Sequence, residues 1–143
     1  DLPVNTHGHE TILLVEDARA VRVLARDVLK AQGYAVLEAE HGREALRIAE
    51  QYAGPIHLLL TDVVMPEMNG RDLVEQLAPL HPSMAIIYMS GYTDTVVVHH
   101  GGLTPGAAFL QKPFTPSALV GKVRQLLDTC RDRVREVQPI AAL

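Results

Sequence analysis

Acidic side chains follow short apolar runs at two places in the chain. The run TILLV precedes Glu16 and Asp17, and the run LLLT precedes Asp62. Two other apolar runs lead to a hydroxyl and an amine, since AIIYM precedes Ser90 and FLQ precedes Lys112. A carboxylate can attack phosphorus, and an amine and a hydroxyl can bind the oxygens of the transferred group. These residue types indicate phosphoryl-transfer chemistry if the fold brings them together.

Three acids in one place require a cation. Two carboxylates about 4 Å apart repel each other by roughly 4 kcal/mol at an effective dielectric constant near 20. One lysine, Lys112, cannot neutralise three acids. Mg²⁺ prefers a few carboxylate oxygens and keeps its remaining positions for water or phosphate oxygens. We therefore expect Mg²⁺ among Glu16, Asp17 and Asp62, with Mn²⁺ as the alternative ion.

The surrounding sequence alternates short apolar runs with stretches of helical period. Strands are predicted for Thr11–Val15, Ala35–Ala39, Ile56–Thr61, Ala85–Met89 and Ala107–Leu110. Three of these runs are apolar almost throughout, as expected for parallel strands with helices over both faces. The first helical stretch repeats apolar residues at Val21, Leu24, Ala25 and Val28. The pattern predicts a doubly wound α/β sandwich with a five-stranded parallel sheet and right-handed crossovers.

Cap and turn residues agree with helices between the strands. Gly33 follows the first helical stretch, and Thr115 precedes Pro116 at the start of the last one. A fourth helix over Thr93–His100 is the weakest prediction, because the stretch is β-branched and the glycine-rich loop GGLTPG follows it. In such a sheet, ligands bind outside the carboxyl ends of the strands. The acids, the serine and the lysine are all expected at that edge.

The composition excludes several classes of protein. The chain has 143 residues, 48% of them hydrophobic, which is enough for one packed domain. The net charge is -4 and no basic block is present, so direct nucleic-acid binding is not expected. The single cysteine, Cys130, forms no internal disulfide and indicates a reducing compartment. No apolar run is long enough to span a bilayer, so we expect a cytoplasmic domain without membrane contact, although a parent protein could be membrane-anchored.

The ends of the chain are polar or aperiodic. The opening DLPVNTHGHE lacks an initiating methionine and has the composition of a linker, so we expect a piece of a longer protein. We predict a linker or tail at residues 1–10, one domain at 11–128 and a C-terminal tail at 129–143. The seven histidines raise the question of a metal or phosphohistidine site. None is expected near the acids, and we interpret them as solvated loop residues.

The motifs, taken in order, resemble those of the receiver domains of two-component response regulators, which have a CheY-like, flavodoxin-like fold. LLVEDA (Leu13 to Ala18) is similar to the acidic-pair motif of that family, and LLLTDVVMPEMNG to its phosphoacceptor motif. MSGY and FLQKPF are similar to its switch-hydroxyl and lysine motifs. The resemblance extends from about Thr11 to Leu127 with all motifs in order.

By this resemblance, Asp62 is the aspartate that becomes phosphorylated. Mg²⁺ is then held by Glu16, Asp17 and Asp62 together with the backbone carbonyl of Val64. The family chemistry is transfer of a phosphoryl group from a kinase phosphohistidine to the aspartate, followed by hydrolysis. Because Val64 is apolar and cannot position an attacking water, we hypothesise that the acyl phosphate is comparatively long-lived. The domain itself would catalyse only its own phosphorylation and dephosphorylation.

The resemblance also implies a conformational switch. Ser90 is the switch hydroxyl, Phe109 the switch aromatic residue and Lys112 the phosphate-binding amine, with a cis bond between Lys112 and Pro113. An output partner is expected on the face formed by the fourth helix, fifth strand and fifth helix. The phosphoryl donor is expected to be a histidine kinase or a histidine phosphotransfer domain.

The parent protein is open to more than one interpretation. The segment SGYTDTVVVHHGGLTPGAAFLQKPFTPSAL is similar to receivers at the C-terminal end of hybrid sensor histidine kinases, so the parent chain could itself be a histidine kinase. A stand-alone regulator is the alternative. From other classes, a haloacid-dehalogenase-type phosphatase would need a second acid at Val64, and a pseudo-receiver would have lost an acid or the lysine. Position 64 is not acidic, and the three acids and the lysine are all retained.

Overall fold

The computed structural model describes residues 7–91 and 107–141, and the backbone alone for 131–141. A five-stranded parallel sheet has the order β2-β1-β3-β4-β5. Its strands are β1 (Thr11–Val15), β2 (Ala35–Ala39), β3 (Leu58–Asp62), β4 (Ala85–Ser90) and β5 (Ala108–Gln111). The helices are α1 (Arg19–Ala31), α2 (Gly42–Gln51), α3 (Gly70–Leu77) and α5 (Pro116–Ala141). The predicted fold class is confirmed, and the fourth helix expected at 93–100 lies outside the described residues.

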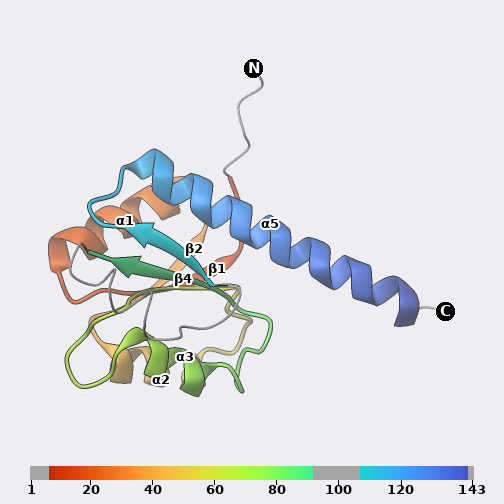
Figure 1. Ribbon diagram of the computed structural model, residues 1–143, viewed down its shortest axis with the longest axis horizontal. Helices are drawn as coiled ribbons and strands as arrows, with labels where there is room; N and C mark the ends of the chain where they lie inside the picture. Colours follow the sequence, from red (N-terminus) through yellow and green to blue (C-terminus); the bar gives the residue numbers. More distant parts are fainter. Residues whose placement is uncertain (1–6, 92–106, 142–143) are drawn as a thin grey trace.

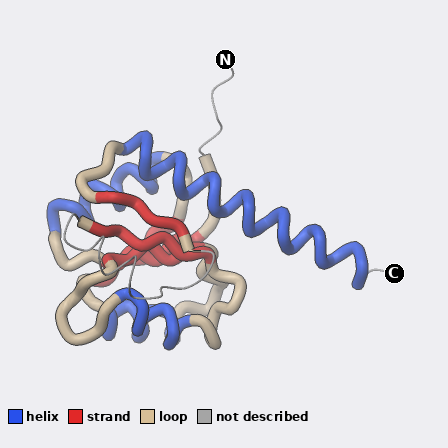
Figure 2. The backbone as a smooth tube through the Cα atoms, in the orientation of Figure 1, coloured by secondary structure: helices blue, strands red, loops and turns tan. Residues whose placement is uncertain are grey.

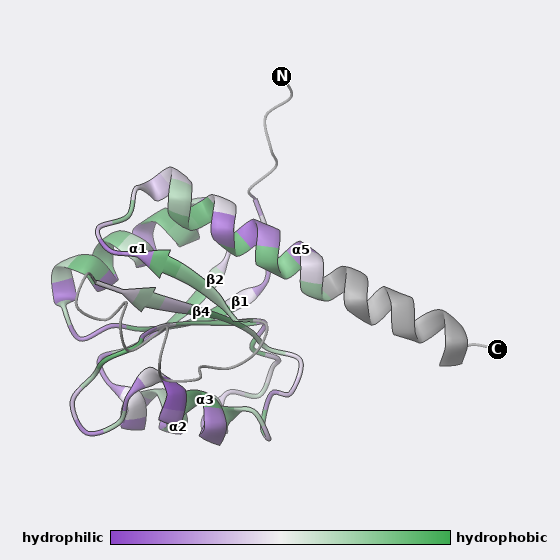
Figure 3. Ribbon diagram, in the orientation of Figure 1, coloured by the Kyte–Doolittle hydropathy of each residue, from purple (hydrophilic) through white to green (hydrophobic). Residues whose placement is uncertain are grey.

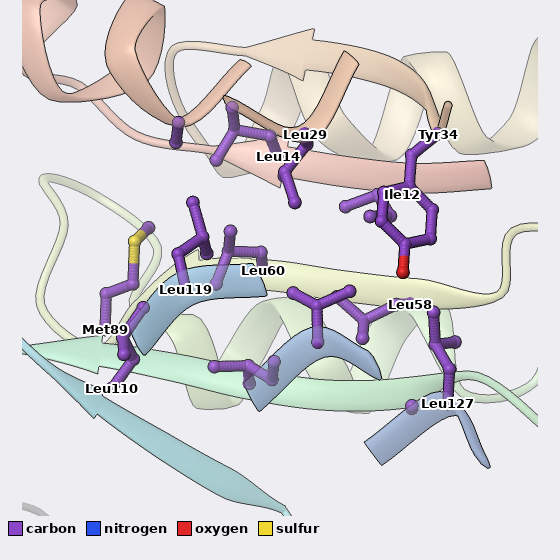
Figure 4. Close-up of a cluster of buried hydrophobic side chains, with 14 residues drawn as sticks. Ile12, Leu14, Leu29, Tyr34, Leu58, Leu60, Met89, Leu110, Leu119 and Leu127 are labelled. Atoms are coloured by element: carbon purple, nitrogen blue, oxygen red, sulfur yellow. The ribbon is translucent and has the colours of Figure 1, made fainter. Parts of the chain in front are cut away.

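The helices form a layer on each side of the sheet. Figures 1 and 2 show α1 and α5 over one face and α2 and α3 over the other. Because successive side chains of a strand point to opposite faces, Ile12 and Leu14 pack toward α1 and α5, whereas Leu13 and Val15 pack toward α2 and α3. Figure 4 shows the first of these two cores, with Leu29 of α1 and Leu119 and Leu127 of α5 against the sheet.

Capping residues begin and end the helices as their chemistry requires. Gly33 follows α1 with φ of 103°, in the left-handed region that favours glycine. The Thr115 hydroxyl accepts a hydrogen bond from Ala118 N at 3.1 Å and caps α5. The Asn69 side chain accepts from Asp72 N at 2.8 Å and fixes the start of α3 directly after the β3 loop. The sequence-based predictions for Gly33 and Thr115 are confirmed.

Two details of the helix predictions are wrong. Leu24 was placed in the buried stripe of the first helix, but it is 47% exposed and Arg22 occupies the buried position. Arg22 stays in the interior because its side chain donates a hydrogen bond to the backbone at the end of β1. Residues 129–141, which were expected to form a tail, continue the last helix to Ala141, since helix-forming residues such as Arg, Glu and Gln occur there.

Hydropathy follows the same layers. In Figure 3 the strands and the inward sides of the helices are mostly green, and the outer sides of α2 and α3 carry much of the purple. Leu73, Val74 and Leu77 of α3 are buried, whereas its Arg71 and Glu75 are exposed and form an ion pair at 3.4 Å. Within the described ranges, none of the helices has the length and apolar character that crossing a membrane requires.

Candidate active site

The strand order brings the three predicted acids together. Glu16 and Asp17 follow β1 directly, Asp62 is the last residue of β3, and β1 and β3 are neighbours in the sheet. One carboxylate oxygen from each acid lies within 4.8 Å of the other two. Glu16 is fully buried and Asp62 is 4% exposed, whereas Asp17 is open to solvent. The result is a carboxylate cluster at the carboxyl edge of the sheet, with one exposed member.

Lys112 reaches this cluster from the end of β5. Its Nζ lies 2.5 Å from Glu16 Oε1 and 2.5 Å from Asp62 Oδ1. Its backbone N–H donates to the Ser90 carbonyl at 2.8 Å, which fixes the lysine to the end of β4. The bond from Lys112 to Pro113 is cis, as the family resemblance implied. The structure therefore brings all four charged site residues into one cluster.

Burial and mutual repulsion set the protonation of the site. Burial raises the pKa of Asp62 to about 8, and the neighbouring Glu16 carboxylate acts in the same direction. Burial also acts to raise the pKa of Glu16, but hydrogen bonds involving Asp62, Lys112 and the Ala18 N–H lower it to about 2. The two carboxyls titrate as a coupled pair. Without a metal ion, the pair therefore retains a proton near neutral pH.

The donor set fits a hard divalent cation. Glu16 Oε1 is buried and, among the described residues, contacts the Lys112 amine without a hydrogen bond of regular geometry. Three carboxylates face one amine, so the cluster has an excess of negative charge. Carboxylate oxygens are the ligands that Mg²⁺ prefers. In the described part of the chain, the Val64 carbonyl has no hydrogen-bond donor.

Arg22 is a site residue that the sequence analysis missed. Its Nη1 donates to the backbone carbonyl of Glu16 at 2.7 Å, and the side chain is almost completely buried. The same guanidinium lies 3.6 Å from Glu38 and 3.5 Å from Glu40. Arg22 thus connects the end of β1 to the end of β2. An arginine one turn after the acidic pair, beside apolar helix positions, was the available signal.

The predicted switch residues lie on the neighbouring strands. Ser90 ends β4 and is 7% exposed. Phe109 of β5 is 37% exposed and stacks on the buried ring of Tyr88, with centroids 5.7 Å apart and an interplanar angle of 25°. Tyr88 was not singled out by the sequence, because an apolar strand gives no sign of which ring contacts another. The switching roles of Ser90 and Phe109 remain predictions.

The loop after Asp62 approaches the end of β3 closely. Gly70 N–H donates to the Val63 carbonyl at 2.8 Å. A Cβ at Gly70 would collide with the Asp62 carbonyl and contact the Tyr88 ring. Glycine is therefore required by space at this position, which couples the start of α3 to the backbone of Asp62.

The histidines do not contribute to the acidic cluster in the described part of the chain. His41 caps α2 by accepting from Glu44 N at 3.2 Å. His57 is an exception to the prediction of solvated loop residues, since it is half-buried and its Nδ1 accepts from Thr11 N at 3.0 Å. His99 and His100 lie outside the described residues.

The fold and this site together define a signalling domain of two-component systems. The chain belongs to the response regulator receiver domain family, whose model matches residues 12–124. Receiver domains interact with histidine kinases or with phosphotransfer partners. The family thus accounts for the doubly wound sheet and for the chemistry that the acidic cluster permits.

Individual relatives agree with this assignment. The sensor kinase CckA of Brucella abortus (strain 2308) is 39% identical over 121 residues, which are 85% of this chain and 13% of that protein. The chemotaxis protein CheY of Thermotoga maritima is 33% identical over 110 residues, 76% of this chain and 90% of that protein. A crystal structure of the receiver domain of the hybrid histidine kinase CckA superimposes with a TM-score of 0.70 at 38% identity, covering 82% of this chain and 98% of that one.

Proposed function

We propose that Asp62 is the phosphoacceptor and that Glu16, Asp17 and Lys112 are its catalytic environment. The observation that carries this proposal is the convergence of three carboxylates and one amine at the carboxyl edge of the sheet. A rigid strand end fixes the line of attack of the Asp62 oxygen. Mg²⁺ is proposed to bind Glu16, Asp17, Asp62 and the Val64 carbonyl, with Mn²⁺ as the alternative.

The proposed reaction requires a deprotonated Asp62. An oxygen of Asp62 attacks the phosphorus of a phosphohistidine, the O–P bond forms, and the P–N bond breaks with its electron pair passing to the imidazole. A bound divalent ion would supply positive charge that favours the ionised aspartate and stabilises the transferring oxygens. Lys112 exchanges its contact with the Asp62 carboxylate for one with a phosphoryl oxygen. Hydrolysis of the acyl phosphate returns the site to its starting state.

Phosphorylation would then change the surface. The phosphoryl group adds nearly two negative charges next to Lys112, and the Ser90 hydroxyl can donate to one of its oxygens. Movement of Ser90 would leave space into which Phe109 can rotate from its exposed position beside Tyr88. We propose β5 and α5, with the predicted fourth helix, as the face that an output partner binds.

The parent protein is proposed to be a hybrid sensor histidine kinase, with a stand-alone regulator as the alternative. The similarity to the CckA receiver supports this proposal, and the chain spans 13% of that kinase. The proposed domain is residues 11–128. Its proposed phosphoryl donor is a histidine kinase or a histidine phosphotransfer domain, its location is the cytoplasm, and it does not contact nucleic acid directly.

Intact-mass measurement after incubation with Mg²⁺ and acetyl phosphate tests the proposal. We expect the chain to gain one phosphate, and we expect Asp62→Asn to gain none. Asp72→Asn is the matched control, because Asp72 is an exposed aspartate of α3 outside the cluster. Labelling of Asp62→Asn, or continuous turnover of acetyl phosphate without a labelled protein, would contradict the phosphoacceptor role and favour a phosphatase.

A further inference from the structure

A second cavity lies at the amino ends of the strands, at the opposite edge of the sheet from the acidic cluster. It encloses about 470 Å³ between the segments that precede β1, β3 and β4 and the side of α5. This volume is within the usual range for small-molecule sites. No residue of the acidic cluster lines it. The cavity is therefore independent of the phosphoryl-transfer chemistry.

The walls of the cavity are mainly apolar. Ile56, Met84 and Leu127 line it and are buried, and Leu127 belongs to the core shown in Figure 4. Leu80 also lines it and is 48% exposed, so apolar surface remains uncovered there. Covering such surface is favourable at roughly 25 cal/mol per Å². The walls therefore favour a ligand with an apolar body.

His57 lines this cavity, and one hydrogen bond fixes the tautomer of its ring. Its Nδ1 accepts from the Thr11 backbone N–H at 3.0 Å, so the neutral ring carries its proton on Nε2. Its backbone is fixed as well, because His57 N–H donates to the Thr11 carbonyl and its carbonyl accepts from Ala85 N, both at 2.9 Å. Within the described ranges, no residue accepts from Nε2.

A metal ion does not fit this cavity. His9, His57, His81 and Cys130 all line it, and these residue types bind transition metals. A ligating histidine normally donates through its other nitrogen, whereas Nδ1 of His57 is an acceptor and Nε2 keeps the proton. Among the described residues, the only group of three metal donors within mutual reach is the acidic cluster.

We propose that this cavity binds a molecule with an apolar body and a carboxylate or carbonyl oxygen. The apolar body contacts the apolar walls, and the oxygen accepts the Nε2–H of His57. Glu10 lines the same cavity, and its Oε2 lies 2.7 Å from Arg124 Nη2, which is also 2.9 Å from Asp128 Oδ1. The Glu10 carboxylate is thus already bound within the protein, and the Nε2–H of His57 is the donor that selects the ligand oxygen. A bound molecule would contact Leu127 and Cys130 and so stabilise the position of α5.

Titration with 2-naphthoate, followed by amide chemical shifts, tests the proposal. We expect saturable shifts concentrated at residues 56–57, 80–84 and 127–130. The matched compound 2-naphthylmethylamine has the same rings but a cationic donor in place of the acceptor, and it should bind at least about fivefold more weakly, the effect of one hydrogen bond. Equal affinity for the two compounds, absence of saturable shifts, or shifts centred on the acidic cluster would overturn the proposal.

Two variants distinguish loss of the hydrogen bond from His57 Nε2 from a nonspecific effect of a substitution on the fold. His57→Asn keeps an acceptor for Thr11 N–H and removes the Nε2 donor, so 2-naphthoate should bind it about fivefold more weakly. Asp72→Asn should bind 2-naphthoate like the unaltered chain, because Asp72 is exposed on α3 and does not line the cavity. Unchanged affinity in His57→Asn, or lost affinity in Asp72→Asn, would contradict the assignment.

The unaltered chain provides a further measurement. Cys130 is the only cysteine, so each alkylation detected by intact mass reports on this cavity. Saturating 2-naphthoate should slow the alkylation of Cys130 by iodoacetamide several-fold, whereas 2-naphthylmethylamine at the same concentration should not. Equal alkylation rates with and without 2-naphthoate would count against binding beside Cys130.

Discussion

At the scale of single residues, the site is defined by charged side chains that are in direct contact and largely shielded from solvent. Asp62, Glu16 and Lys112 share contacts of 2.5 Å in a buried setting. The lysine compensates one carboxylate, and the second remains a source of repulsion. The sequence predicted these residues and their meeting point, because strand ends of a parallel sheet share an edge. The sequence analysis missed Arg22, whose burial depends on a backbone carbonyl that the folded strand presents.

Replacement of Asp62 should stabilise the metal-free protein. The pKa of Asp62 is raised from 3.8 to about 8, so between these pH values the folded state binds more protons than the unfolded state. Stability from this group is therefore lost as the pH rises toward 8. Asp62→Asn removes the repulsion, and at pH 8 without metal we expect its free energy of unfolding to be higher by about 2 kcal/mol.

Urea unfolding at pH 6 and pH 8, with and without saturating Mg²⁺, measures this effect. The advantage of Asp62→Asn should be larger at pH 8 than at pH 6. Saturating Mg²⁺ should reduce or reverse it, because the ion, in the proposed site, would bind the ionised carboxylate. If the variant were less stable than the unaltered chain at pH 8 without metal, the repulsive account of the cluster would be wrong.

Arg22 is expected to position the acidic pair. Its guanidinium holds the Glu16 carbonyl at 2.7 Å, so Arg22→Ala should destabilise the fold by about 2 kcal/mol and weaken Mg²⁺ binding several-fold. Arg22→Lys should recover part of the Mg²⁺ affinity, since an ammonium can still donate to the carbonyl. Arg19→Ala is the control, because Arg19 is exposed on α1. Unchanged Mg²⁺ affinity in folded Arg22→Ala, measured by amide shifts, would limit Arg22 to a structural role.

At the scale of elements, the contact between α3 and β3 carries a testable consequence. Gly70→Ala would place a Cβ against the Asp62 carbonyl, and we expect it to destabilise the domain by about 1 to 3 kcal/mol and to slow labelling by acetyl phosphate. Gly121→Ala is a contrasting variant, because nothing lies within 4 Å of a Cβ there. Because Gly121 lies inside α5, this replacement should stabilise the domain by about 0.5 to 1 kcal/mol. Thermal unfolding of both variants should give opposite signs, and equal signs would refute the steric argument.

The sequence predicted the type of each described helix and strand better than its first and last residues. The bounds of β1 and β2 agree with the runs TILLV and AVLEA because apolar runs ending at a turn have clear limits. The third strand begins at Leu58 instead of Ile56, because Ile56 lies in the loop that lines the second cavity. The length of α5 was underestimated, since charged residues of high helix propensity give no apolar period after Leu127. The ends of these elements are set by strand pairing and by burial of side chains, which the local sequence pattern does not show.

At the scale of the whole molecule, one buried polar network joins the start of the chain to its last helix. Arg124 of α5 contacts both carboxylate oxygens of Glu10, at 3.1 and 2.7 Å. The same guanidinium donates to the hydroxyl of Tyr34 at 3.2 Å and lies 2.9 Å from Asp128. These contacts span more than one hundred residues of sequence at the edge of the sheet opposite the acidic cluster. Their loss should therefore loosen α5, which is part of the proposed output face.

Acid should break this network in a defined range of pH. Burial alone would raise the pKa of Glu10, but hydrogen bonds from Arg124 and from the Glu10 and His9 N–H groups lower it from 4.5 to about 2. The folded state therefore binds fewer protons than the unfolded state between these values, and stability from Glu10 is complete above about pH 4.5 and lost as the pH falls toward 2. After allowance for solvent screening we expect a contribution of about 2 kcal/mol.

Glu10→Gln tests this origin of the acid sensitivity. At pH 7 the variant should unfold more easily by about 2 kcal/mol, because the buried Arg124 loses the more buried of its two carboxylate partners. Between pH 4.5 and 3 its free energy of unfolding should fall less steeply than that of the unaltered chain, since one carboxylate with a lowered pKa is gone. Glu75→Gln, which alters an exposed ion pair of α3, should change neither quantity measurably. Parallel acid profiles for Glu10→Gln and the unaltered chain would show that Glu10 is not the titrating group that fastens α5 to the sheet.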